Sequence, residues 1–368
     1  MEPNDMNRVL QIPPMAGNPR NSEGDFVRLA DGRWLFVYTH FEGGAGDHAA
    51  AYLAGRYSDD GGVSWTQEDA VILPNEGKMN VMSVSLLRLT DGRICLVYLR
   101  KNSLTDCLPY ARFSTDEAET WSAPFSIVQD EDTGYYVVNN DRLVQLSDGR
   151  LIVPTALHSG TGSGAQSDFY SPYGRVFCYL SDGDPGEVGG KWHRGQEVLV
   201  EDRSGDGRTM VQEPGVVELT DGRLMMFCRT DAGSQYVAYS RDRGETWSPL
   251  RPSDIISPRS PASIKRIPST GDLLLVWNNH AGAPEALEGK RTPLTAVISR
   301  DEGATWENVR TLESNPHGWY CYTAIAFPED QVMLAHSAGD RRENNGLAML
   351  QITRFPVDWL YGNGGRGS

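Results

Sequence analysis

Short apolar runs alternate with polar turns along most of the chain. In six places an Asp-Gly pair or a close relative separates two such runs, as in LADGRWLFVY and LTDGRLMMFC. A turn dipeptide of this kind between alternating apolar residues is the strongest short-range signal of a β-hairpin. No segment longer than about a dozen residues shows a convincing 3.6-residue period. The pattern therefore predicts an all-β chain that contains six hairpins.

A second phrase, Ser-x-Asp-x-Gly-x-Thr-Trp, recurs between the hairpins. Its copies begin at Ser58, Ser114, Ser240 and Ser299, and a degenerate copy runs from Ser181 to Trp192. In each copy we expect Ser and Asp to bond the backbone of their own turn, Gly to supply a positive φ, and Trp to pack between neighbouring sheets. The first copy has Ser64 in place of Thr, and the second has Ala118 in place of Gly. The phrase is thus predicted to be a structural turn that lies away from any catalytic site.

The two signals together predict how the hairpins are arranged. Copies of the turn phrase start roughly sixty residues apart, a spacing typical of a repeat architecture. One hairpin and one such turn per repeat describe a four-stranded antiparallel sheet, and several of these sheets pack radially. We therefore predict a six-bladed β-propeller. It would form one domain over residues 1–368, with a short N-terminal lead and a flexible C-terminal tail.

Composition excludes several classes of function. The net charge of -15 argues against a nucleic-acid partner. The sequence contains no run of eighteen apolar residues, so no membrane span is predicted. The five cysteines are widely spaced and mostly lie in apolar runs, which indicates reduced core thiols rather than disulfides or a metal site. No signal peptide is visible, so we expect a cytoplasmic protein if the chain is complete, and a periplasmic or secreted one if a signal was removed.

The chain resembles the sialidase (neuraminidase) superfamily, in particular the bacterial-type exo-sialidases with Asp-box (BNR) repeats. Four boxes on a six-repeat all-β chain carry part of this resemblance. The sharper match is MVQEPGVVELTDGRLMMFCRTDAGSQYVAYSRDRGETW, residues 210–247. It is similar to the family segment with a catalytic Glu just before a hairpin strand and an Arg at the end of the next strand. The resemblance assigns these roles to Glu213 and Arg229.

Two more roles follow from the C-terminal part of the resemblance. The third Arg of the family stands a short strand ahead of a box, and KRTPLTAVISRDEGATW places Arg291 there. The nucleophilic Tyr corresponds to Tyr322 in WYCYTAIAF. Tyr320, two residues earlier and expected on the same face of a strand, stays open as the alternative nucleophile.

The N-terminal part of the resemblance is less regular. The catalytic Asp corresponds to Asp47, in a Gly-rich loop ahead of the first box, and the first Arg corresponds to Arg20. The Arg-Ile-Pro of the family is replaced here by RNS, residues 20–22. Glu23 and Asp25 are therefore expected to add polar contacts that the family lacks.

The chemistry that the resemblance implies explains these residue types. A sialic acid carries a carboxylate on its anomeric carbon, and convergent arginines recognise it through planar, charge-assisted hydrogen bonds. That carboxylate repels an anionic nucleophile, whereas a Tyr hydroxyl approaches neutral and loses its proton to an adjacent Glu. The implied reaction has Tyr322 as nucleophile, Glu213 as its base and Asp47 as acid and then base. It proceeds with retention and without metal or cofactor.

Alternatives remain open at this point. A glycosidase of the same fold acting on a neutral sugar such as arabinose would not need three convergent arginines, and a non-catalytic glycan-binding propeller would not need a nucleophile. The favoured partner is a sialylated or other acidic-sugar glycan. A polar run that enters the third hairpin is also expected to touch the substrate; it comprises Asn139, Asn140, Asp141 and Arg142.

Overall fold

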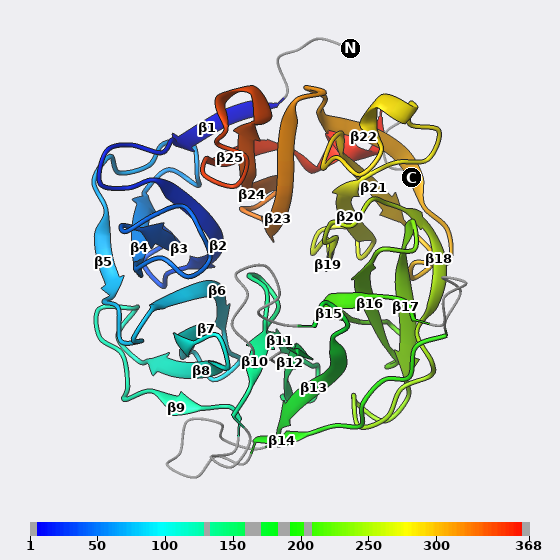
Figure 1. Cartoon of the computed structure of the whole chain (residues 1–368), viewed down its shortest axis with the longest axis horizontal. Helices are drawn as coiled ribbons and strands as arrows, with labels where there is room; N and C mark the ends of the chain where they lie inside the picture. Colours follow the sequence, from blue (N-terminus) through cyan, green and yellow to red (C-terminus); the bar gives the residue numbers. More distant parts are fainter. Residues whose placement is uncertain (1–5, 129–132, 159–170, 183–191, 202–207, 363–368) are drawn as a thin grey trace.

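The structure is a computed structural model that describes residues 6–128, 133–158, 171–182, 192–201 and 208–362 (Figure 1). The expected lead at residues 1–5, the expected tail at 363–368 and residues 183–191 of the degenerate fifth turn phrase lie outside the described residues. No helix in the described ranges is long and apolar enough to cross a membrane.

The strands of the described residues form five sheets, which confirms the all-β class. The first contains β2 (Arg20–Arg28), β3 (Trp34–Phe41), β4 (Ala51–Ser58) and β5 (Ala70–Leu73). The second, nine-stranded, contains β6 (Asn80–Arg88), β7 (Ile94–Ser103), β8 (Asp106–Ser114), β9 (Phe125–Ser126), β10 (Tyr135–Val137), β11 (Val144–Gln145), β12 (Leu151–His158), β13 (Arg175–Ser181) and β14 (Trp192–Arg194). In this sheet, β8 and β10 are joined by one parallel pair, Cys107 with Tyr135.

The remaining three sheets have four strands each. The third contains β15 (Val211–Glu218), β16 (Leu224–Thr230), β17 (Ser234–Ser240) and β18 (Arg251–Ile256), and the fourth contains β19 (Ser263–Arg266), β20 (Leu273–Asn278), β21 (Leu294–Ser299) and β22 (Glu307–Glu313). The fifth joins both ends of the chain, with the order β1 (Asn7–Ile12), β25 (Leu350–Pro356), β24 (Gln331–Asp340) and β23 (Gly318–Ala326). The described part of the chain also contains three short 3-10 helices: η1 (Glu285–Leu287), η2 (Arg341–Glu343) and η3 (Val357–Tyr361).

The sheets surround a common centre, and β2, β6, β11, β15, β19 and β23 lie nearest to it (Figure 1). All six predicted hairpins are confirmed, because the strands on either side of each predicted turn pair antiparallel. Each inner strand is thus held by the local turn chemistry that the sequence encodes. Side chains at the inner ends of different sheets can then meet around the centre.

The four complete turn phrases have the predicted structure. In the first, the Ser58 hydroxyl donates to Asp60 Oδ1 at 2.9 Å, and the Ser64 amide donates to the same oxygen at 2.9 Å. The Gly62 amide donates to Ser58 Oγ at 2.9 Å. Ala118, at the Gly position of the second copy, has a φ of 67°. Trp65 packs in a buried cluster that includes residues of the first and fifth sheets, as predicted.

The two repeated signals also contact each other. The Arg that follows an Asp-Gly turn lies over the aromatic ring just before the Ser of the next box, as Arg33 lies over Tyr57 at 5.3 Å from the ring centroid. Arg223 lies over Tyr239 in the same way, at 5.4 Å. This stacking connects each of these hairpin turns to the strand that leads into the box. All five cysteines are buried and free, which confirms that they are core thiols.

Candidate active site

Four inner strands have a β-bulge at the same relative place, and each bulge turns one polar side chain toward the centre. The residues are Glu23 on β2, Ser83 on β6, Glu213 on β15 and Tyr322 on β23, and their φ angles lie between 53° and 59°. A left-handed conformation costs a residue with a side chain about 1–2 kcal/mol. Strain of this kind is typical of functional sites.

Two of the bulges depend on a neighbouring glycine. A Cβ on Gly215 would lie 2.2 Å from the ring of Phe227, and one on Gly24 would lie 2.4 Å from the ring of Phe36. The absence of a side chain therefore lets the aromatic ring of the next strand pack directly under the bulge. This packing holds the left-handed residue in place.

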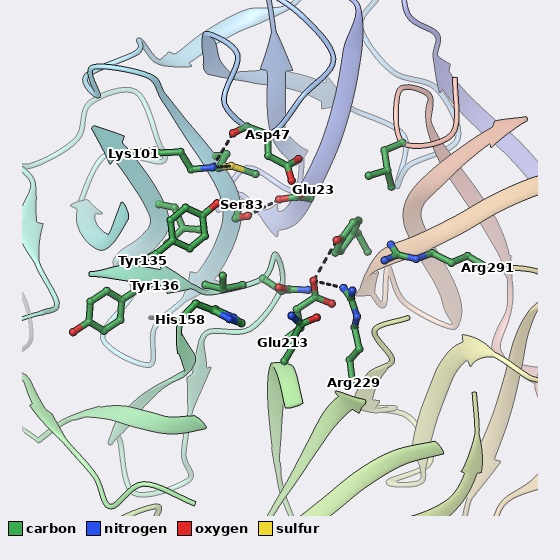
Figure 2. A pocket seen from close by; sticks show the side chains of 17 residues that line it. Glu23, Asp47, Ser83, Lys101, Tyr135, Tyr136, His158, Glu213, Arg229 and Arg291 are labelled. Atoms are coloured by element: carbon green, nitrogen blue, oxygen red, sulfur yellow. Dashed lines mark hydrogen bonds and ion pairs between the residues drawn. The ribbon is translucent and has the colours of Figure 1, made fainter. Parts of the chain in front are cut away.

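All four bulge residues line one cavity of about 220 Å³ (Figure 2). Five of the six predicted site residues line it as well: Asp47, Glu213, Arg229, Arg291 and Tyr322. The sixth, Arg20, is not part of the lining. The other lining residues are Met82, Leu99, Lys101, Tyr135, Tyr136, Val137, Asn139, His158, Gln212 and Leu347.

Tyr322 and Glu213 form a hydrogen-bonded pair in this cavity. The Tyr322 hydroxyl donates to Glu213 Oε1 at 3.2 Å, and Arg229 Nη1 donates to the same oxygen at 2.6 Å. Burial alone would raise the pKa of Glu213, but the charges of Arg229 and Arg291 hold it below its usual value. Burial and the charge of Glu213 raise the pKa of Tyr322 well above that of a free phenol. The pair is therefore a neutral phenol beside an ionised carboxylate, which suits a nucleophile and its base.

Tyr320 is placed differently. The bulge at Tyr322 interrupts the two-residue alternation of β23, so the expectation that the two tyrosines share a face is wrong. The ring of Tyr320 packs edge-on against His336 with 6.1 Å between ring centroids, and it does not line the cavity. Of the two candidate nucleophiles, Tyr322 and Tyr320, only Tyr322 is in position to meet a ligand in the cavity.

Arg229 and Arg291 are equally buried, with 9% of each exposed, but their surroundings differ. Arg229 is paired with Glu213 at 2.6 Å. Among the described residues, no carboxylate lies within ion-pair distance of Arg291; its Nη1 contacts Cys321 Sγ at 3.0 Å, and its guanidinium lies 5.4 Å from the ring centroid of Tyr322. A buried cation without an anion is costly to maintain. Arg291 is therefore available to an anionic ligand in the cavity.

Arg20 lies against Asp47 instead of facing the cavity. Its side chain is 2% exposed, with Nη1 at 2.5 Å from Asp47 Oδ1 and Nη2 at 3.1 Å from Glu23 Oε1. Desolvation raises the pKa of Asp47, but the charge of Arg20 lowers it by more, so the pKa lies below its usual value. The loop of Asp47 is anchored by Asn80 and Lys101, which donate to the Asp47 carbonyl at 2.9 and 2.7 Å. In this state Asp47 is an ionised carboxylate at the rim of the cavity.

The polar run at residues 139–142 is largely structural. Asn139 lines the cavity, but Asn140 donates to the carbonyls of Gly24 and Tyr322 at 2.8 and 3.0 Å. Asp141 accepts the Ile325 amide at 2.9 Å, and Arg142 Nη2 donates to the Ala262 carbonyl at 2.7 Å. These side chains join the inner strands of different sheets at the centre. Of these four residues only Asn139 lines the cavity, so a substrate contact from this run stays a prediction for Asn139.

Sequence reasoning missed several lining residues, among them Ser83, Leu99 and Lys101. None belongs to a motif. Ser83 is part of the apolar run NVMSVSLLR, where a small polar residue carries no visible signal. Its orientation follows from the bulge, which involves pairing with β7.

Comparison with known proteins gives a consistent set of relatives. The family model of the BNR repeat-like domain matches residues 56–334. A protein of Bacteroides fragilis named sialidase is 29% identical over 225 residues, which are 58% of this chain and 36% of that protein. The anhydrosialidase of Macrobdella decora is 25% identical over 349 residues, or 87% of this chain and 42% of that protein. The chain thus spans less than half the length of these curated relatives.

A solved structure shows the same fold. The intramolecular trans-sialidase of Ruminococcus gnavus, in complex with oseltamivir carboxylate, superposes with a TM-score of 0.69 at 16% identity. The match covers 94% of this chain and 96% of that one. At this level of identity the likeness concerns the fold.

Proposed function

The chain belongs to the family of BNR repeat-like domains, and from this premise we propose that it is a retaining exo-glycosidase of the sialidase type. It would hydrolyse a terminal sialic acid or a related 2-keto-3-deoxy sugar acid. We also propose that the fold is a six-bladed propeller. The nine-stranded sheet would then divide into two blades at the single parallel pair between Cys107 and Tyr135.

One observation carries the proposal: the Tyr322–Glu213 pair shares a cavity with Arg291, a buried cation that no described carboxylate neutralises within ion-pair distance. A substrate carboxylate would supply the missing anion. Arg229 and Arg291 would hold it by charge-assisted hydrogen bonds, which are stronger than neutral ones. A neutral sugar would leave Arg291 without an anion.

The proposed reaction has two steps. Tyr322 Oη attacks the anomeric carbon while Glu213 takes its proton, the bond to the leaving group breaks, and Asp47 donates a proton to the departing oxygen. Asp47 then takes a proton from water, which attacks the same carbon and releases Tyr322, and Glu213 returns the proton to the phenolate. Two displacements on one carbon give net retention.

Arg20 enters this scheme through Asp47. An acid must hold a proton, but the contact with Arg20 favours the ionised form of Asp47. We propose that the substrate carboxylate draws Arg20 Nη1 away from Asp47 while Nη2 keeps its contact with Glu23, so that Arg20 becomes the third arginine of the site. Asp47 would then take up a proton from solvent and act as the acid.

The size of the cavity supports exo action. Pockets for drug-sized ligands are about 300–1,000 Å³, whereas this one is about 220 Å³. A single terminal sugar unit suits this volume, and an internal segment of a glycan does not. The leaving group would remain outside the cavity, next to Asp47 at its rim.

Hydrolysis of a small set of aryl glycosides tests the proposal. The set contains α-ketosides of N-acetylneuraminic acid, its deaminated form and a shorter ulosonic acid, together with an arabinofuranoside. We expect release from at least one ketoside, loss of that release in Tyr322→Phe, and retention of it in Tyr320→Phe. The Tyr322→Phe variant should still bind the free sugar acid, and a rise in its melting temperature on addition of the acid measures this binding. Release from the arabinoside alone, or full activity of Tyr322→Phe, would overturn the proposal.

A further inference from the structure

The cavity contains a second hydroxyl–carboxylate pair that the proposed hydrolysis does not use. The Ser83 hydroxyl donates to Glu23 Oε2, and Glu23 Oε1 accepts from Arg20 Nη2 at 3.1 Å. The arrangement repeats that of Tyr322, Glu213 and Arg229: a hydroxyl and an arginine bind one buried carboxylate. In both pairs the hydroxyl and the carboxylate stand at left-handed bulge positions. Figure 2 shows Glu23 and Ser83 on the side of the cavity near Asp47, away from Arg229.

Glu23 differs from its buried neighbour Asp25 in the partners that it binds. Asp25, two residues further on, is also buried, and it accepts the backbone amides of Leu86 and Phe26 at 2.7 Å each, which links β2 to β6. Glu23 accepts no backbone amide from the described part of the chain; its hydrogen bonds come from the side chains of Arg20 and Ser83. It faces the cavity instead.

Holding Glu23 in this place is unfavourable in two ways. Its backbone is left-handed, with a φ of 56°. Its carboxylate is buried, and burial together with the nearby charge of Asp47 raises its pKa although Arg20 acts in the opposite direction. A strained backbone and a buried charge that faces a cavity are features of ligand-binding positions.

The chemistry of the pair defines what it can bind. The proton of Ser83 Oγ is committed to Glu23, so the hydroxyl oxygen and both carboxylate oxygens have only lone pairs left to offer. Such a surface accepts hydrogen bonds from a hydroxyl group and repels a carboxylate. Arg229 and Arg291 have the opposite preference. A sugar acid would therefore bind with its carboxylate at the arginines and a hydroxyl-bearing carbon at Glu23.

We propose that Glu23 and Ser83 are specificity-determining residues that accept a hydrogen bond from one hydroxyl group of the glycone. The substrate class is then the sugar acids that carry a free hydroxyl at the position that meets this pair. The inference rests on the proposed hydrolysis and deepens it. A glycone in which this hydroxyl group is removed or alkylated cannot donate a hydrogen bond to the buried carboxylate of Glu23, and it is rejected.

The test uses the aryl α-ketoside of the deaminated nonulosonic acid and its monodeoxy derivatives, each lacking a different hydroxyl. For the wild-type protein, we expect one derivative to lose about 10- to 100-fold in kcat/KM, because a hydrogen bond to a charged group is lost. In Glu23→Gln and in Ser83→Ala, the ratio of kcat/KM for the parent ketoside to kcat/KM for that derivative should fall toward one. The loss of discrimination should appear mainly in the KM values.

Asp25→Asn is the matched control, because it also converts a buried carboxylate on β2 into an amide. It should lower thermal stability and leave the ratio unchanged. If Glu23→Gln lowers kcat/KM for every derivative by the same factor, Glu23 acts through Arg20 and the inference is wrong. It is equally wrong if the wild-type protein does not discriminate among the derivatives. Failure to cleave any acidic ketoside overturns the proposed function itself, and this inference with it.

Discussion

The stability of the fold should respond differently to the same substitution at the two buried arginines of the cavity. Arg229 and Arg291 are each 9% exposed, but only Arg229 has a carboxylate partner within ion-pair distance among the described residues. Arg229→Met leaves Glu213 as a buried carboxylate without its ion pair. Arg291→Met removes a buried cation that lacks such a partner. The fold should therefore lose stability in the first variant and largely keep it in the second.

The expected magnitudes follow from these contacts. Breaking a buried ion pair from one side costs about 3–5 kcal/mol. For Arg229→Met the lower end of that range applies, because Tyr322 still donates to Glu213 and Arg291 still acts on it. For Arg291→Met we expect a change within about 1 kcal/mol of zero, because losing the attraction between Arg291 and Glu213 offsets the gain from removing a buried cation that has no carboxylate within ion-pair distance. The guanidinium borders the cavity, which limits the gain.

Urea unfolding followed by tryptophan fluorescence measures both effects at pH 7. Arg175→Met is the control, because Arg175 forms an exposed ion pair with Glu197, and such pairs contribute about 1 kcal/mol or less. A saturating free sugar acid should raise the midpoint of the wild-type protein and of the control, but of neither cavity variant. The reasoning is refuted if Arg291→Met loses as much stability as Arg229→Met, since Arg291 would then be a structural residue.

Three further predictions concern the turns, pH and the loop of Asp47. Asp301→Ala removes hydrogen bonds from the Thr305 amide at 2.8 Å and the Thr305 hydroxyl at 2.6 Å, so the melting temperature should fall while kcat and KM stay unchanged. Lost activity at full stability would contradict a structural box. The fold lowers the pKa of Glu213 from about 4.5, so the charge of Glu213 stabilises the fold above that pH, and this stabilisation is lost as the pH falls through the folded pKa. Between pH 7 and pH 3 the melting temperature should therefore fall more steeply in the wild-type protein than in Glu213→Gln. The reverse order would disprove the assignment. Asn80→Ala removes hydrogen bonds to the carbonyls of Asp47 and Ala49 at 2.9 and 2.8 Å, which anchor the loop of Asp47. Because Asp47 is then positioned less well, kcat on the cleaved ketoside should fall about 10-fold with little change in KM. An unchanged kcat would show that Lys101 alone holds the loop.

Local chemistry explains what could be predicted of the fold. An Asp-Gly turn and its flanking apolar runs lie within about ten residues of each other, and the box turn bonds its own backbone, as Asp60 does with Ser58 and Ser64. Such elements form the same way wherever they stand in a chain. The pairing of Glu213 with Arg229 was predictable for a similar reason, because the hairpin between them brings the two residues to neighbouring positions.

The sequence by itself thus determined the hairpins, the box turns and the kinds of residue that the site contains. The tertiary structure alone decided which of these residues face the cavity. Tyr322 faces it and Tyr320 does not because a bulge interrupts β23, and Arg20 is turned to Asp47 and Glu23 rather than to the cavity. The physical reason is that a bulge depends on how two neighbouring strands pair, and a buried ion pair depends on how a strand and a loop pack, and neither can be read from the alternation of apolar and polar residues. A one-residue change in strand register reverses the face of every side chain that follows.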